Sequence, residues 1–174
     1  MTDQPDTSRR DFVAAAVTVA AAAGAATGAQ AQAQVQAQAP SNLRFSNPPG
    51  MSKPPSYSHV VEVTGPSRTI YLAGQTGGDA SGKVAEGIRA QTTQVLENIK
   101  TALAFAGGGF EHVVKITSYL VDLERDGATF REVRASYFPN KAALPASTLL
   151  QVSRLANPKY LVEIDVVAVM PPKG

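Results

Sequence analysis

Short runs of aliphatic and β-branched residues predict five strands along this chain. They cover residues 58–63, 68–74, 113–123, 144–155 and 160–170. In the last run, "YLVEIDVVAVM", acidic and apolar residues alternate, so Glu163 and Asp165 share one face of the strand. A carboxylate is costly to bury unless it is paired or used in chemistry. These two residues are therefore candidates for a functional role.

Two other segments have helical spacing. Over residues 86–106, apolar or small side chains recur every three or four positions, and a run of three glycines ends the pattern. A shorter helix is predicted over residues 127–138, with a buried stripe of Phe130, Val133 and Tyr137. The order β-β-α-β-α-β-β predicts an α+β (mixed α/β) domain with both helices on one face of a sheet. The other face also needs a cover, which a small domain can gain by forming an oligomer.

The first 39 residues differ in composition from the rest. "SRRDFV" at residues 8–13 precedes an Ala/Val-rich stretch and a Gln-Ala repeat with Ala-x-Ala triplets, a pattern typical of an export signal and its cleavage site. The motif resembles a twin-arginine signal, so we expect a bacterial periplasmic or secreted protein. The alternative is a solvent-exposed amphipathic helix or a disordered arm. Residues 40–56 are predicted to be an extended lead-in, and residues 57–172 the folded domain.

Composition narrows the possible functions. The chain has 174 residues and a formal net charge of +2, with no Lys/Arg cluster apart from Arg9 and Arg10, so nucleic-acid binding is not expected. No other run approaches the ~20 apolar residues needed to span a membrane. Cysteine is absent, and His59 and His112 have no paired spacing. We therefore expect no disulfide, metal or cofactor.

Three local patterns are candidates for binding or catalysis. Residues 77–83, "GGDASGK", have the spacing of a phosphate-binding loop, but Val84 replaces the Ser or Thr that such a loop needs, so a turn is the better interpretation. Residues 57–59, Tyr-Ser-His, form either a polar pocket wall or the entry to a strand. Glu163 and Asp165 are either solvated on an open sheet face, or one of them lies in a subunit cleft and orients water or accepts a proton.

Five segments carry a family resemblance. They are "PPSYSHVVEV", "IYLAGQTGGDASGKV", "QTTQVLENIKTALAFAGGGFEHVVKITSYLVDL", "YFPN…LPAS" and "YLVEIDVVAV". In this order, from about Pro55 to Ala168, they resemble the RidA/YjgF family of small trimeric proteins. The resemblance implies a chorismate-mutase-like fold, three sheets packed into a closed barrel, and ligand clefts between subunits. It also implies hydrolysis of reactive imines and enamines to ketones and ammonia.

The resemblance further implies roles for individual residues. Glu163 matches the family carboxylate that positions and activates water. Tyr57 matches a tyrosine that lines the cleft, and Gly74 matches a glycine at a strand end. Asp165 occupies a second acidic position, which is interpreted as structural.

Three positions depart from the family pattern. Ser147 stands where deaminating members carry an arginine that holds the substrate carboxylate with two hydrogen bonds. Arg154 is an odd number of positions further on, so in a regular strand it faces the other way. Ala73 replaces a serine, and His59 replaces a glutamine. Losing such a clamp costs about 1.5–3 kcal/mol per contact, so weak turnover of small imino acids is expected.

The sequence therefore predicts an exported RidA-like homotrimer that hydrolyses an imine, an enamine or a related small molecule. Ser147, Thr148 and His59 would give its cleft a polarity that differs from the family pattern. The alternative is a non-catalytic trimer that binds a small molecule, or acts as a chaperone, without deaminase activity.

Overall fold

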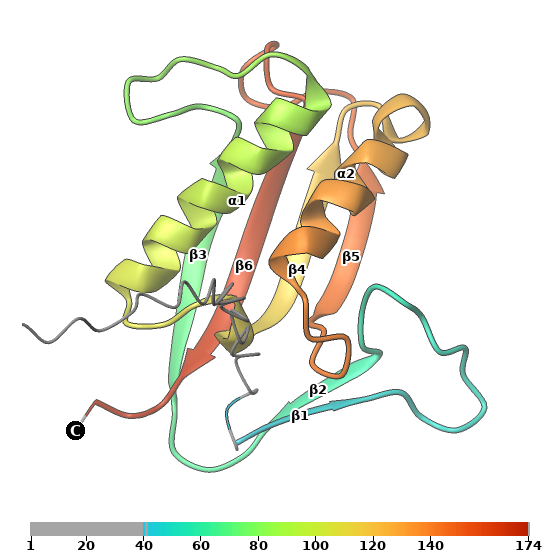
Figure 1. Cartoon of the computed structure of the whole chain (residues 1–174), viewed down its shortest axis with the longest axis vertical. Helices are drawn as coiled ribbons and strands as arrows, with labels where there is room; N and C mark the ends of the chain where they lie inside the picture. The colour runs from blue at the N-terminus through green and yellow to red at the C-terminus, as the bar shows by residue number, and fades with distance from the viewer. Residues whose placement is uncertain (1–39, 41, 174) are drawn as a thin grey trace, which may run out of the picture. The chain divides into compact units, whose positions relative to one another are not determined.

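The computed structural model describes residues 40 and 42–173, so the predicted export signal lies outside the described residues. The main sheet has its strands in the order β3-β6-β4-β5 (Figure 1). These strands are β3 (Arg68–Thr76), β4 (Val113–Leu120), β5 (Ala146–Gln151) and β6 (Val162–Met170). β6 is antiparallel to both of its neighbours, whereas β5 is parallel to β4. The sheet is therefore mixed, which agrees with the predicted fold class.

Two helices cover one face of this sheet (Figure 1), as the sequence predicts. They are α1 (Gly87–Phe105) and α2 (Leu123–Tyr137), and a short 3-10 helix, η1 (Phe110–His112), leads into β4. The layer between helices and sheet holds the main core. Its fully buried side chains include Leu96, Ile99, Leu103, Ile116 and Ile164. Neither helix has the length and apolarity that a membrane-spanning helix requires.

The boundary between β4 and α2 differs from the prediction. The strand predicted to continue to residue 123 ends at Leu120, and α2 begins at Leu123 rather than at residue 127. Asp122 explains the difference, because its side chain accepts a hydrogen bond from the backbone N–H of Arg125 at 2.9 Å. This bond caps the first turn of the helix and ends the strand.

Part of the predicted lead-in is a strand. β1 (Leu43–Ser46) pairs antiparallel with β2 (Val60–Val63) in a separate two-stranded sheet, a pairing that the sequence analysis did not identify. Apolar side chains of this pair pack against the face of the main sheet opposite the helices. The cluster comprises Leu43, Phe45, Val61, Val114, Val167 and Val169. The chain thus covers one end of its own second face.

The remainder of that second face is called the open face below. Side chains of neighbouring strands meet on it in register, since Tyr119 pairs with Glu163, and Thr117 pairs with both Asp165 and Thr148. Tyr71 on β3 is 78% exposed. The open face is therefore polar and accessible in the single subunit, in contrast to the apolar face under the helices.

Candidate functional site

Glu163 and Gly74 fit together on the open face. A Cβ atom placed on Gly74 would lie 2.0 Å from Oε1 of Glu163 and 3.0 Å from Oδ1 of Asp165. The Glu163 carboxylate therefore occupies space that any other residue at position 74 would fill. The β3–β6 register also shifts between Leu72 and Gln75, beside this glycine. A local irregularity of β3 and the absent side chain together make room for the carboxylate.

The same geometry brings two carboxylates together. Their oxygens lie 2.0 Å and 3.0 Å from one point, so Oε1 of Glu163 and Oδ1 of Asp165 are at most 5.0 Å apart. The pKa of Glu163 is raised, first by burial and then by the negative charge of Asp165. Both causes stabilise the protonated carboxyl group. Glu163 therefore binds a proton more readily than an exposed glutamate does, as a group that accepts and returns protons requires.

Tyr119 completes this cluster, and the sequence analysis did not identify it. Its hydroxyl donates a hydrogen bond to Oδ2 of Asp165 at 3.0 Å. That bond, together with burial, raises the pKa of Tyr119, so the phenol remains a donor at neutral pH. The alternation of β4 does predict that Tyr119 shares a face with Thr117. Only the register of β4 against β6 places it beside the acidic pair.

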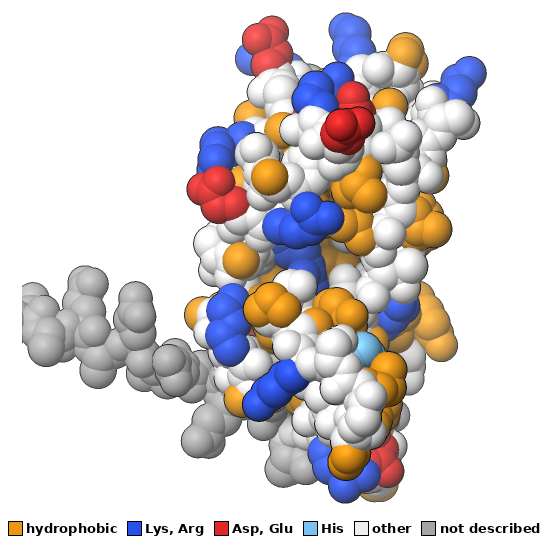
Figure 2. Space-filling view, turned by 90° about the vertical axis from the view of Figure 1, so that its right-hand side faces the viewer, with side chains coloured by type: hydrophobic (Ala, Val, Ile, Leu, Met, Phe, Trp, Pro, Cys, Tyr) orange, Lys and Arg blue, Asp and Glu red, His pale blue; other side chains and the backbone are white. Residues whose placement is uncertain are grey.

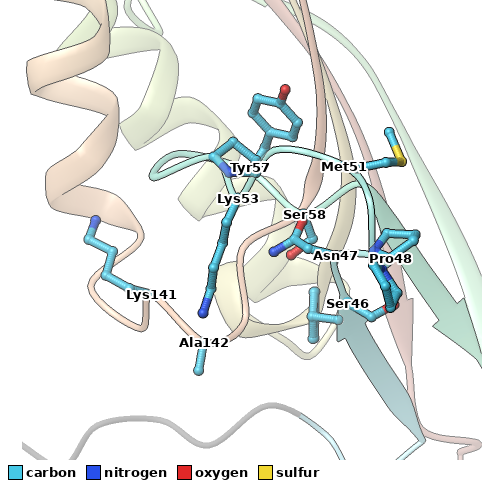
Figure 3. Close-up of a pocket in the computed structure, with 12 residues that line it drawn as sticks. Ser46, Asn47, Pro48, Met51, Lys53, Tyr57, Ser58, Lys141 and Ala142 are labelled. Carbon is cyan, nitrogen blue, oxygen red and sulfur yellow. The ribbon is translucent and has the colours of Figure 1, made fainter.

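Tyr57, Ser58 and His59 lie in the segment that joins β1 to β2. The Tyr57 and His59 rings pack edge to face, with centroids 5.3 Å apart. The His59 backbone N–H donates to Oδ1 of Asn47 at 3.0 Å, and Nε2 of His59 lies 2.9 Å from the Ser52 carbonyl oxygen. These two contacts of His59 hold the segment folded back on itself. Tyr57 and Ser58 line a cavity of about 780 Å³ there, whereas His59 is not among its lining residues (Figure 3).

The structure does not bring this segment to Glu163 within one subunit. The Ser58 backbone N–H donates to the carbonyl oxygen of Pro145 at 3.2 Å, just before β5 begins. The first residue of β5 pairs with Lys115, whereas Glu163 pairs with Tyr119. Pro145 and Glu163 are thus five residues apart along the strands, which is ~17 Å at ~3.3 Å per residue. The predicted site residues form two separate groups in the single chain.

The two predicted site residues of β5 point in opposite directions. Ser147 pairs with the fully buried Ile116 and lies on the helix side, whereas Thr148 lies on the open face, where its hydroxyl accepts a hydrogen bond from Nζ of Lys115. The strand predicted over residues 144–155 ends at Gln151. Arg154 is exposed and lies beyond it, so the argument from strand alternation does not apply to Arg154.

Within residues 40 and 42–173, no group of three or more potential metal-ligating side chains forms a metal site. The arrangement on the open face is instead that of paired carboxylates, which can orient water and transfer protons without a metal. The fold and this acidic pair define the class of protein: a small α+β domain with helices on one face of a mixed sheet and carboxylate chemistry on the other.

Comparison with known proteins identifies the family. The family model described as Endoribonuclease L-PSP matches residues 51–170. The chain belongs to this family, which is also the RidA/YjgF/RutC family, as the sequence predicts.

Two relatives illustrate the range of the family. A RutC family protein of Pyrococcus horikoshii is 43% identical over 114 residues, which cover 64% of this chain and 85% of the relative. A 2-iminobutanoate/2-iminopropanoate deaminase of Mus musculus is 39% identical over 118 residues, covering 67% of this chain and 82% of the relative. The family therefore includes a protein named as an imine deaminase.

Solved structures confirm the predicted fold. A Rid family protein of Yersinia pestis superposes with a TM-score of 0.68 at 33% identity, over 74% of this chain and 99% of that protein. RidA from a Psychrobacter species superposes with a TM-score of 0.56 at 32% identity, over 72% of this chain and 94% of that protein. The chorismate-mutase-like α+β fold predicted from the sequence is therefore correct.

Proposed function

We propose that this protein hydrolyses an imine or enamine to a carbonyl compound and ammonia, with Glu163 as the residue that activates water. The observation that carries the proposal is the position of the Glu163 carboxylate, which occupies the side-chain space of Gly74 beside a second carboxylate. The absent side chain of Gly74 leaves room for this carboxylate on the open face, where it can orient a water molecule for attack.

The proposed reaction is balanced by one water molecule. The ionised Glu163 carboxylate accepts a proton from water as the oxygen attacks the C=N carbon, and it returns that proton to the nitrogen. This gives a carbinolamine. Glu163 then takes the proton of its hydroxyl group and passes it to the nitrogen, so that the carbonyl forms, the C–N bond breaks and ammonia leaves. The raised pKa of Glu163 suits both steps, because the carboxyl group must gain and lose a proton near the working pH.

We propose further that the site is completed by assembly into the homotrimer that the family resemblance implies. Two observations support this. The polar open face is accessible in the single subunit, and the Tyr57 segment lies ~17 Å along the strands from Glu163. A second subunit packed on the open face could bring its own Tyr57, and its Thr148, toward Glu163.

Export through a twin-arginine signal within residues 1–39 is also part of the proposal. A reporter protein fused after residue 39 should reach the periplasm. The Arg9→Lys/Arg10→Lys variant of the same fusion should not be exported.

The proposal is tested by replacing Glu163 with glutamine, which keeps the shape of the side chain and removes its charge. The substrate is 2-iminopropanoate, generated by an amino-acid oxidase, and the readout is the rate of imine loss. We expect Glu163→Gln to lower kcat at least 100-fold with an unchanged oligomeric mass. Glu124→Gln, which makes the same change on the exposed first turn of α2, should retain wild-type activity.

A non-catalytic function is the second candidate, and one observation favours it. Phe105 is 95% exposed and lies with Tyr71 on a shallow apolar pocket beside β3, a surface suited to holding another molecule. If the wild type hydrolyses neither 2-iminopropanoate nor a carboxylate-free imine above the rate of Glu163→Gln, this second candidate replaces the first.

A further inference from the structure

Arg134 on α2 is a buried cation without a counterion. Arg134 is only 7% exposed, and its Nη1 donates a hydrogen bond to the carbonyl oxygen of Ser56 at 3.0 Å. Nε and Nη2 are buried and have no partner, and no carboxylate of the described chain forms a salt bridge with them. Burial lowers the pKa of Arg134 to about 10, so the guanidinium still carries its charge at neutral pH.

Such an arrangement is unfavourable unless something else is bound. A buried charge without a partner strongly destabilises the folded state. The Phe138 ring lies 5.2 Å from Cζ of Arg134, and this cation–π contact offsets only part of that cost. A chain that keeps a buried guanidinium with two free donors therefore has a position ready for an anion.

The pattern of free donors indicates what kind of anion fits. Nε–H and one N–H of Nη2 lie parallel on one edge of the guanidinium plane. This edge binds both oxygens of a carboxylate at once, in two parallel hydrogen bonds. Nη1, which belongs to the other edge, is the atom already bonded to Ser56. The fork that matches a carboxylate is thus the part of Arg134 that remains unpaired.

A cavity lies next to the chain segment that contacts this guanidinium. Ser56, whose carbonyl accepts the Arg134 bond, directly precedes Tyr57 and Ser58, which line the cavity of about 780 Å³. This volume is typical of a small-molecule site. Lys53 and Lys141 also line the cavity (Figure 3), and none of its lining residues carries a carboxylate. The cavity is therefore electropositive. Arg134 does not line it, but Nη1 of Arg134 binds Ser56, the residue directly before the lining residues Tyr57 and Ser58.

The surrounding surface has the same charge character. Lys and Arg side chains lie at the upper end, along the middle and at the lower end of the face shown in Figure 2, whereas carboxylates lie mainly at its upper end and its edges. Nζ of Lys141 donates to the carbonyl oxygen of Phe138 at 2.9 Å, which holds a second positive charge at the end of α2. Such a field raises the local concentration of anions.

We propose that this corner binds the carboxylate group of a small organic acid, with Arg134 as its two-pronged anchor and Lys53 and Lys141 as the charges that attract it. The inference rests on the proposed function to the extent that the ligand is then a carboxylate-bearing imine. It replaces the expectation, drawn from Ser147, that the ligand has no cationic anchor. Since Nε and Nη2 are shielded from solvent, the side chains around them must shift for the ligand to reach them.

The test measures binding without turnover. The probe is 2-oxobutanoate, the keto acid that hydrolysis of the matching imine would release, and its uncharged analogue 2-butanone is the ligand control. We expect calorimetric titration to show binding of 2-oxobutanoate and none of 2-butanone. Arg134→Met should weaken binding at least tenfold. Arg131→Met, which removes the same group from an exposed position one turn earlier on α2, should leave the dissociation constant within twofold of wild type.

Thermal unfolding separates an anchor from a structural arginine. Because Arg134→Met removes an unpaired buried charge, the ligand-free variant should unfold at the same temperature as wild type or a higher one, and 2-oxobutanoate should no longer raise that temperature. An unfolding temperature that falls while affinity is unchanged would instead mean that Arg134 is satisfied by a trapped water molecule, and would overturn the proposal. Absence of 2-oxobutanoate binding to wild type would also overturn it.

A measurement on the wild type covers the case in which Arg134→Met fails to fold. The Nε–H signal of Arg134 in a ¹⁵N spectrum should shift as 2-oxobutanoate is added, and an unchanged signal at saturation would refute the anchor. Failure of the proposed hydrolysis leaves these results unaffected, because each of them reports binding alone.

Discussion

Replacing Gly74 with alanine should disable the proposed site while leaving the fold intact. Gly74 does not have a positive φ, so its backbone accepts alanine without strain. The added Cβ would lie 2.0 Å from Oε1 and 2.8 Å from Cδ of Glu163. The carboxylate must therefore move by roughly 1.4 Å to reach ordinary van der Waals distance.

The structural cost and the catalytic cost of this displacement differ in size. The clashing atoms belong to the end of a flexible side chain, so a change of rotamer relieves the contact at about 0.5–1.5 kcal/mol. Part of this is offset, since alanine restricts the unfolded chain and returns about 0.4–1 kcal/mol. The free energy of unfolding should therefore change by less than ~1 kcal/mol. A catalytic group misplaced by ~1 Å, in contrast, costs about 100-fold in rate.

The assay compares kcat and unfolding temperature for wild type, Gly74→Ala and Gly78→Ala. Gly78 is the matched control. A Cβ added at Gly78 would lie 3.8 Å from the nearest atom, the Tyr160 hydroxyl oxygen, and the φ of Gly78 is not positive, so alanine fits there. Gly74→Ala should lose about 100-fold in kcat and remain folded, and Gly78→Ala should match wild type. In a Glu163→Ala background, Gly74→Ala should no longer cost stability. A Gly74→Ala protein with full activity would refute the placement of Glu163.

Three further outcomes are expected from the charges of the described chain. Asp165→Asn removes the negative charge that helps to raise the pKa of Glu163. Because the ionised Glu163 carboxylate is the active form in the proposed reaction, the acidic limb of the pH–rate profile should move to lower pH. A limb that stays in place would contradict the interaction between the two carboxylates. The raised pKa of Glu163 means that the folded state binds this proton more tightly than the unfolded state, so stability falls as pH rises from the unfolded pKa through the folded one. Glu163→Gln should therefore stabilise the protein at pH 7, and the gain should vanish below about pH 4. Thermal unfolding at a series of pH values measures this. The carboxylate of Asp126 is 3% exposed and accepts hydrogen bonds from Nε and Nη2 of Arg125 at 2.8 and 2.6 Å. Arg125→Ala removes this partner, so urea denaturation should show a free energy of unfolding that is lower by about 1–3 kcal/mol. An unchanged midpoint would mean that water replaces the guanidinium.

Local patterns were sufficient for most of the fold. The period of β6 places Ile164 and Glu163 on opposite faces, and hydrophobic spacing identifies both helices, because burial against a neighbouring layer imposes those periods. β1 was missed because it is only four residues long and pairs with a strand fourteen residues further on. Its pairing, rather than its own composition, makes it a strand.

The candidate site was only partly accessible from the sequence. Glu163 could be identified because an acidic residue interrupts an apolar strand. The fit between Glu163 and Gly74 could not, since 88 residues separate them and a glycine has no side chain whose pattern could be recognised. Tyr119 is likewise placed beside Asp165 by the register of two strands, which no local pattern specifies.

Arg134 shows most clearly where sequence patterns end. It lies four residues after Phe130, on the same helix face as the predicted buried stripe, although that prediction did not include it. A charged residue on such a face is a signal that could have been followed. What the sequence cannot give is the absence of a partner, because any of the chain's carboxylates could have been folded against it. That absence is a property of the whole tertiary structure, established only when every neighbour of the guanidinium is known. The same reasoning makes the unpaired fork informative. The salt bridge between Arg125 and the buried Asp126 is formed, whereas Nε and Nη2 of Arg134 have no partner within the described residues.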